Sequence, residues 1–149
     1  MGEFLKTTVS FSITVKDGNA ALHFYSEAFG ATETFRMPLP NGGLAHAEFL
    51  IGDTRIFLSE EYPDWKAFAT PEGQFTPCLL NIEVDDCDAA HAKALKAGAE
   101  EISPPKDEFW GIRSSIIADP FGFRWSFGQL IEEISLEEVA KRAHELFGG

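Results

Sequence analysis

The feature that most restricts the fold of this chain is an internal repeat. Val15 ends an alternating segment, Thr7–Val15, and Val84 ends a similar segment 69 positions later. The pairs Gly30-Ala31 and Gly98-Ala99 follow at a spacing of 68. A solenoid repeats every 20–50 residues and needs several copies. Two copies of this length therefore predict a duplicated structural module.

Each copy predicts one strand, one helix and three further strands. In the first, apolar residues alternate over 7–15, and Asp17-Gly18-Asn19 offers N-cap chemistry for a helix over Ala20–Phe29. Strands are expected over 35–38, 44–51 and 54–59. The second copy predicts a strand over 78–84, a helix over 87–97, and strands over 102–103, 112–118 and 123–127.

The predicted class is α+β, with all 149 residues in one domain of two βαβββ modules. We place the modules at about 7–60 and 77–129, with a linker over 61–76. The linker aromatics Tyr62, Trp65 and Phe68 suit a lid or a dimer contact. A capping box at Ser135-Leu-Glu-Glu138 starts a C-terminal helix over about 136–147.

Composition narrows the possible partners. The 24 acidic and 12 basic residues give a formal charge of −12, which argues against nucleic acid and against an anionic membrane surface. No long apolar run and no signal-peptide pattern occurs, so we expect a cytoplasmic protein with reduced thiols. Cys78 lies in an apolar strand and is expected in the core, while Cys87 opens a helix.

Several segments, in this order, resemble the PhnB-like branch of the glyoxalase/bleomycin-resistance/extradiol-dioxygenase (vicinal oxygen chelate) superfamily. The resemblance covers roughly residues 7–147. The segments that carry it are Asp119-Pro-Phe-Gly-Phe-Arg-Trp-Ser-Phe127, His46-Ala-Glu-Phe-Leu-Ile-Gly-Asp53, Leu58-Ser-Glu-Glu61, Phe109-Trp-Gly-Ile-Arg113, and His23-Phe-Tyr25 followed by Phe29-Gly30.

The resemblance implies a curved eight-stranded mixed sheet around a cleft, with helices on its outer face and a homodimer as the assembly. Catalytic relatives hold a divalent metal through His, Gln or Glu on the first and last strands of each module. The corresponding positions here are Ser10, Phe57, Leu79 and Ser126. Leu and Phe cannot ligate a metal and Ser is a poor ligand for Zn, Ni or Fe. We therefore predict no metal and no cofactor.

Strand alternation also predicts which side chains line the cleft. The mixture of apolar and polar groups on that face suits a small-molecule pocket. The predicted ligand-binding residues are Ser10, Ser12, His46, Glu48, Phe57, Asn81, Trp110, Arg113, Arg124 and Ser126, with Leu50, Leu79, Glu83 and Ser115 on the same face.

His46 and Glu48 are the candidate catalytic residues, because positions i and i+2 of a strand share a face. They would serve as acid and base, or as two metal ligands with a third donor such as Glu83. The alternative is that His46 has its hydrogen bonds satisfied within the cleft and has no catalytic role, and that Glu48 forms an ion pair with Arg113 or Arg124.

Two functions remain open from the sequence. One is a binding module that sequesters a flat, aromatic or cationic molecule, with Trp110 stacking on it and Arg113 clamping an anionic group. The acidic charge and the abundance of Phe favour this reading. The alternative is a glyoxalase-like lyase, isomerase or oxygenase that uses a metal or the chemistry of His46 and Glu48.

Overall fold

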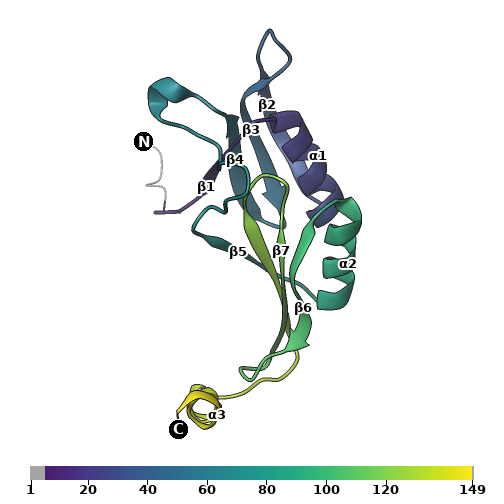
Figure 1. The fold of residues 1–149 in the computed structure, drawn as a ribbon, viewed down its shortest axis with the longest axis vertical. Coiled ribbons are helices and arrows are strands. Elements are labelled where there is room, and N and C mark those ends of the chain that lie inside the picture. Colours follow the sequence, from purple (N-terminus) through teal and green to yellow (C-terminus); the bar gives the residue numbers. More distant parts are fainter. Residues whose placement is uncertain (1–5, 149) are drawn as a thin grey trace. The chain divides into compact units, whose positions relative to one another are not determined.

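The computed structural model describes residues 6–148, which divide into two compact units (Figure 1). The first unit runs to Ser26 and resumes at Gly30–Thr70, and the second contains Glu27–Phe29 and the chain from Pro71 onward. The elements of the first module are β1 (Phe11–Val15), α1 (Gly18–Phe29), β2 (Thr32–Pro38), β3 (Leu44–Ile51), β4 (Thr54–Glu60) and a 3-10 turn, η1 (Pro63–Trp65). Those of the second are β5 (Leu79–Glu83), α2 (Cys87–Ala97), β6 (Glu100–Asp107), β7 (Ile112–Ala118), β8 (Arg124–Leu130) and α3 (Leu136–Phe147).

The two sheets repeat one topology. Their strand orders are β1-β4-β3-β2 and β5-β8-β7-β6. In each, the first and last strands of the module pair in parallel and the remaining pairs are antiparallel. The α+β class, the two βαβββ modules and the C-terminal helix are therefore confirmed. The eight predicted strands are present, four in the sheet of each module.

Strand boundaries differ most from the prediction at β1 and β6. β1 begins at Phe11 and not at Thr7, and Val9 before it is 90% exposed. β6 is eight residues long although it contains Pro104 and Pro105. Proline is tolerated in edge strands, and the register shifts between Ser103 and Lys106 where the prolines lie.

Both module helices start and end by the same chemistry. Asp17 and Asp86 cap them through the backbone N–H groups of Ala20 and Ala89, and both helices end at a left-handed glycine.

A second tie anchors each helix to the last strand of its module. Glu60 Oε2 accepts from Gly18 N at 2.8 Å, and Gln129 Oε1 accepts from Cys87 N at 2.9 Å. Glu60 and Gln129 are 69 positions apart, so the repeat extends to this contact.

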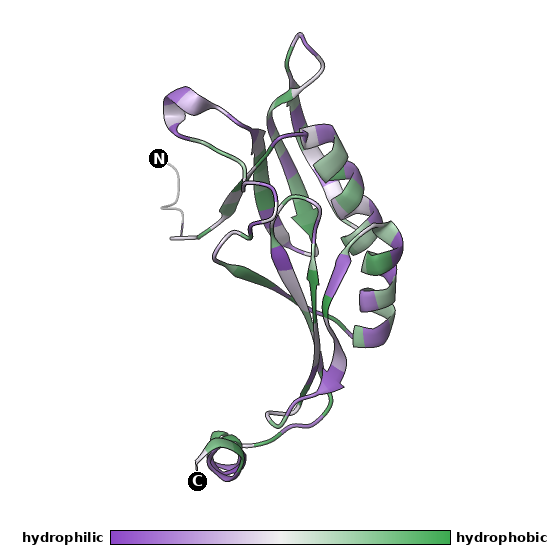
Figure 2. Ribbon diagram, in the orientation of Figure 1, coloured by the Kyte–Doolittle hydropathy of each residue, from purple (hydrophilic) through white to green (hydrophobic). Residues whose placement is uncertain are grey.

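Each sheet buries the apolar face that its helix covers. In the first unit Tyr25 stacks on Phe49 with ring centroids 5.3 Å apart. In the second, Trp125, Phe127 and Cys87 are buried. Hydrophobic and hydrophilic residues alternate along the strands, as period-two burial requires (Figure 2). Cys78 precedes β5 and is exposed, so its prediction as a core residue is wrong.

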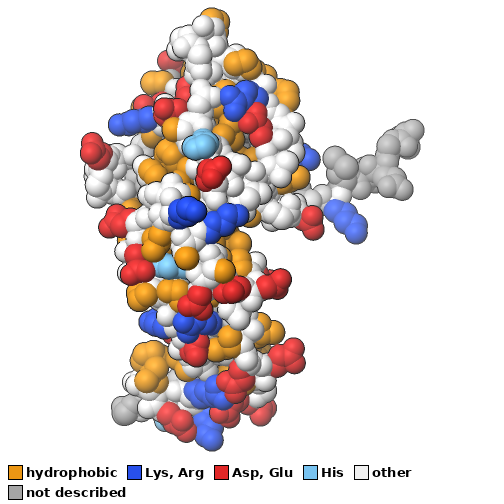
Figure 3. All heavy atoms as spheres, turned by 90° about the vertical axis from the view of Figure 1, so that its right-hand side faces the viewer, with side chains coloured by type: hydrophobic (Ala, Val, Ile, Leu, Met, Phe, Trp, Pro, Cys, Tyr) orange, Lys and Arg blue, Asp and Glu red, His pale blue; other side chains and the backbone are white. Residues whose placement is uncertain are grey.

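The surface carries both signs of charge. Asp, Glu, Lys and Arg side chains lie interspersed on the face drawn in Figure 3. Within residues 6–148, every helix is too short or too polar to cross a membrane.

Candidate functional site

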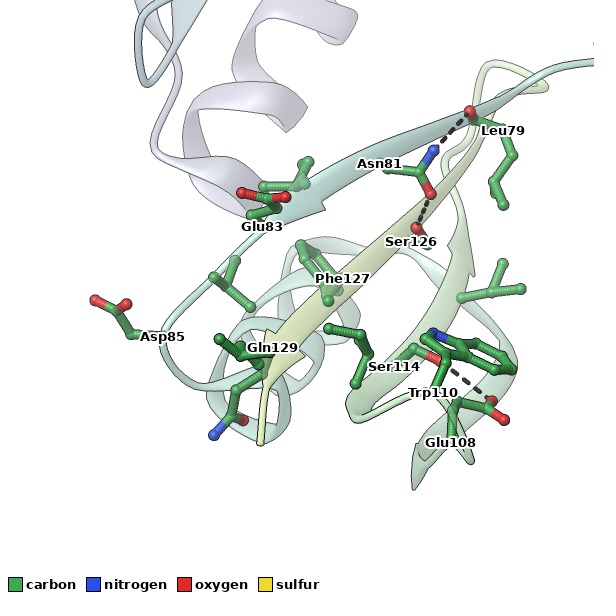
Figure 4. Close-up of a pocket in the computed structure, with 16 residues that line it drawn as sticks. Leu79, Asn81, Glu83, Asp85, Glu108, Trp110, Ser114, Ser126, Phe127 and Gln129 are labelled. Atoms are coloured by element: carbon green, nitrogen blue, oxygen red, sulfur yellow. Dashed lines mark hydrogen bonds between the residues drawn. The ribbon is translucent and has the colours of Figure 1, made fainter. Parts of the chain in front are cut away.

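A groove of about 1040 Å³ lies in the second unit, on the face of its sheet opposite α2. This volume lies at the upper end of the range for small-molecule pockets. The floor comes from residues of β5, β7 and β8, and the loop between β6 and β7 adds one wall (Figure 4). Apolar lining residues include Leu79, Ile82, Val84, Trp110, Ile112, Ile116, Phe127 and Leu130.

Three of the predicted ligand-binding residues lie in this groove: Asn81, Trp110 and Ser126. Asn81 and Ser126 are partners in the parallel β5–β8 register, and Ser126 Oγ donates a hydrogen bond to Asn81 Oδ1. Asn81 Nδ2 donates in turn to Leu79 O at 3.4 Å. The pair thus forms a polar strip on the floor of the groove.

Trp110 lies on the opposite side of the groove, in the loop between β6 and β7 (Figure 4). It is 41% exposed, and its ring meets Phe109 edge-on at a centroid distance of 4.9 Å. A half-exposed indole fixed by a neighbouring ring offers a surface for stacking at little entropic cost.

The groove is acidic. Glu83 and Asp85 lie at its β5 side and Glu108 beside Trp110, and none of the described lining residues is Lys or Arg (Figure 4). Glu108 is mostly buried, accepts from Ser114 Oγ at 3.2 Å, and has Lys106 Nζ at 3.4 Å. Glu83 was assigned to this face from the alternation of β5. Asp85, Glu108 and Ser114 were missed, although Glu108 stands two residues before Trp110.

The prediction that Arg113 and Ser115 of β7 face the cleft is wrong, because both lie on the α2 side of the sheet. Ser115 is fully buried beneath α2, where Cys87 Sγ donates to its hydroxyl at 3.6 Å. Arg113 is on the same side and binds both carboxylate oxygens of Asp88 on α2, at 2.8 and 3.0 Å. A further bond at 2.8 Å joins it to Asp107. These bonds hold the pKa of Asp88 below its usual value.

The cleft roles assigned to Arg113 and Ser115 therefore fail. Apolar residues occupy both odd and even positions of β7, so the alternation of its sequence does not indicate which face packs against the helix. Arg124 shares the face of Ser126, but it lies outside the groove lining, and its Nε is buried without a hydrogen-bond partner among residues 6–148.

The remaining candidates lie in the first unit, on the face of its sheet opposite α1. His46 Nε2 is 3.2 Å from Glu48 Oε1, and Arg55 Nε is 3.9 Å from the other Glu48 oxygen. The His46 ring lies between Phe35 and Phe57, at centroid distances of 6.1 and 5.5 Å. Arg55 is thus the arginine of the same sheet that approaches Glu48, and Arg113 is engaged by Asp88 and Asp107.

Ser12 stands in register with Phe57, which in turn pairs with Glu48. These residues, with His46, form one continuous patch of mixed character. Ser10 is exposed and precedes β1. The structure thus brings His46, Glu48, Ser12 and Phe57 together as predicted, and it leaves Ser10 at the margin.

The residues at the expected metal positions do not fit a divalent metal. Phe57 and Leu79 carry no donor atom, and the hydroxyl of Ser126 is engaged with Asn81. Throughout the described chain, no group of three or more His, Cys, Asp or Glu side chains is arranged to hold a metal ion.

Comparisons with known proteins agree with this fold. The uncharacterized protein Mb0911c of Mycobacterium bovis (strain ATCC BAA-935 / AF2122/97) is 34% identical over 138 residues, 91% of each chain. The crystal structure of TioX from Micromonospora sp. ML1 superposes with a TM-score of 0.67 at 22% identity, covering 84% of this chain and 99% of TioX.

The fosfomycin resistance protein FosX of Listeria monocytogenes, solved with Mn(II) and sulfate, gives a TM-score of 0.66 at 19% identity. That match covers 95% of this chain and all of FosX. A family model described as Glyoxalase/Bleomycin resistance protein/Dioxygenase superfamily matches residues 7–127. The chain therefore belongs to the glyoxalase/bleomycin resistance protein/dioxygenase superfamily.

Proposed function

We propose that this protein binds a small, planar aromatic cation in the groove of its second unit, without a metal, and so sequesters the compound. The observation that carries the proposal is the lining of the groove. It joins an exposed indole to three carboxylates and, among its described residues, contains no cationic side chain.

The two features act on different parts of such a ligand. Trp110 offers a face on which an aromatic ring stacks, and a cation gains further from the quadrupole of the indole. Glu83 and Asp85 form no ion pair within the described chain, so their charge is free to attract a cation into a site with low-dielectric walls. The apolar floor supplies the remaining contact area.

The test compares two ligands of nearly equal shape, N-methylacridinium and neutral acridine, by fluorescence titration at pH 7.5. Two unit charges about 4 Å apart attract by about 1 kcal/mol in bulk water and by about 4 kcal/mol near a protein surface. We expect N-methylacridinium to bind at least about tenfold more tightly. The difference in affinity should shrink in the double variant Glu83→Gln/Asp85→Asn, which lacks the two carboxylates. It should also shrink in high salt, because salt screens exposed charges. Equal affinities for the two compounds would overturn the proposal.

A second candidate function, acid–base catalysis at His46, has one observation in its favour. The imidazole and the Glu48 carboxylate are within hydrogen-bond distance and both are partly exposed, and the imidazole contacts the rings of Phe35 and Phe57. Such a pair positions a histidine to take or give a proton. This candidate belongs to the first unit and is independent of the acidic groove.

Metal content tests the metal-free character of the proposed site. Since the residues at the expected ligand positions cannot form a donor set, we expect elemental analysis of freshly purified protein to give far less than one divalent metal per chain. Added divalent ions should leave the melting temperature unchanged. A stoichiometric metal that disappears in His46→Ala would instead favour an enzyme built on His46 and Glu48.

A further inference from the structure

The loop that presents Trp110 to the groove is a short reversal between β6 and β7. Glu108 N donates to Ile112 O at 2.8 Å and Gly111 N donates to Glu108 O at 3.1 Å, which closes the loop over residues 108–111. Gly111 has a φ of +86°, a conformation that side-chain-bearing residues rarely adopt. The loop is thus locally folded, and the Trp110 side chain at its tip is exposed.

The chain that follows β8 packs onto this loop. Gly111 O accepts from both Ile131 N and Glu132 N, at 3.0 and 3.1 Å. The approach is so close that a Cβ built on Gly111 would lie 2.3 Å from Glu132 O. The loop therefore has a second, tertiary support in addition to its own turn.

A third support comes from α3 and centres on Arg142. Its guanidinium donates to Phe109 O at 3.1 Å, to both carboxylate oxygens of Glu132 at 2.9 and 2.8 Å, and to Glu138 at 3.0 Å. Phe147, at the end of α3, meets the Phe109 ring at a centroid distance of 5.8 Å. A planar guanidinium holds several acceptors in fixed directions at once, which a lysine cannot do.

These contacts are not explained by core formation. None of the twelve residues of α3, all of them described, is buried. The helix is nevertheless strongly two-sided, as Figure 2 shows where it is viewed nearly end-on. Arg142 and Phe147 of this helix both contact Phe109, the neighbour whose ring meets Trp110 edge-on.

We propose that α3 is a positioning element for the groove, in which Arg142 fixes the Phe109 backbone and thereby the orientation of the Trp110 indole. The inference rests on the proposed function for the ligand it serves, but the placement of Trp110 itself is measurable without a ligand. Arg142 is a positioning residue, since it holds the loop from the side of α3 and is absent from the groove lining.

The experiment uses the full-length chain labelled with 5-fluorotryptophan, whose ¹⁹F spectrum reports separately on the three tryptophans. The Trp110 resonance is assigned with Trp110→Phe. In Arg142→Gln we expect this resonance to shift and broaden while the buried Trp125 resonance is unchanged. The matched control is Arg36→Gln, which removes a similar two-oxygen pair with Glu33 in the first unit.

A second variant, Phe147→Ala, removes the ring contact with Phe109 but keeps Arg142, and we expect a smaller change of the same resonance. In the same samples the dissociation constant for N-methylacridinium should rise about threefold to tenfold in Arg142→Gln, the range that loss of a stacking partner produces. An unchanged Trp110 resonance in both variants would overturn the inference. A shifted resonance without any binding of N-methylacridinium would support the positioning role and refute the proposed ligand.

Discussion

Replacing Asp119 by alanine is expected to lower the free energy of unfolding by about 3–5 kcal/mol, the largest effect we expect from a single polar substitution. Asp119 lies between β7 and β8 and is 6% exposed. Its Oδ1 accepts from Phe121 N at 2.8 Å and Phe123 N at 3.0 Å, and its Oδ2 accepts from Trp125 Nε1 at 2.9 Å.

The size of the effect follows from what alanine would leave behind. Three N–H donors, two of them in buried hydrogen bonds, would lose an ionised acceptor. Hydrogen bonds to charged groups are worth about 1.5–3 kcal/mol, and an unsatisfied buried donor costs about 1–3 kcal/mol. The three hydrogen bonds lie within one turn and are coupled, so the sum of their separate contributions exceeds the loss of unfolding free energy that we expect for the variant.

Urea unfolding monitored by circular dichroism measures this loss. Asp53→Ala is the matched control, because Asp53 stands in the hairpin turn of the first module and is exposed. It should change the free energy of unfolding by less than about 0.5 kcal/mol. Asp119→Asn is expected to fall between the two, since an amide supplies only one acceptor oxygen. A loss below about 1 kcal/mol in Asp119→Ala would show that the turn is held by other contacts.

The fold was predictable where a periodic pattern met a strong boundary signal. The N-cap expected at Asp17 is present, and α2 begins and ends at the predicted residues. The alternation of the first strand of each module holds only from Phe11 and from Leu79 onward. Prediction failed on β7, where Ile112 and Ile116 face the groove while Ile117 faces α2. Hydrophobicity alone cannot orient a strand that is apolar on both faces.

The candidate site was predictable only where the alternation of a strand or a local motif placed a residue on the groove. Asn81, Trp110 and Ser126 follow from strand parity and from an aromatic loop, and they do line the groove. Arg113 was misplaced because an arginine on a strand fits a ligand clamp and an ion pair equally well in sequence. Its actual partner, Asp88, is 25 positions away on α2, and no local pattern joins the two. The hydrogen bond between Arg142 and Phe109 spans 33 positions, and no local sequence pattern predicts it either.

Trp110→Ala is expected to weaken the binding of N-methylacridinium about tenfold or more, with little change in folding. Stacking contributes about 0.5–1.5 kcal/mol beyond burial, and a cation over an indole adds about 0.5–2 kcal/mol. Each 1.4 kcal/mol corresponds to a factor of ten in the dissociation constant. The side chain is 41% exposed, so its removal leaves no closed cavity in the second unit.

Fluorescence titration gives the affinity and thermal unfolding gives the stability of the same variant. The matched control is Trp65→Ala, because Trp65 is also exposed and also meets an aromatic neighbour edge-on, Tyr62 at 5.0 Å, but it belongs to the first unit. We expect the control to keep the wild-type dissociation constant, and Trp110→Phe to retain part of the affinity because a ring remains. If Trp110→Ala and Trp65→Ala bound the cation equally well, Trp110 would not contact the ligand, and stacking on its indole would make no contribution to binding.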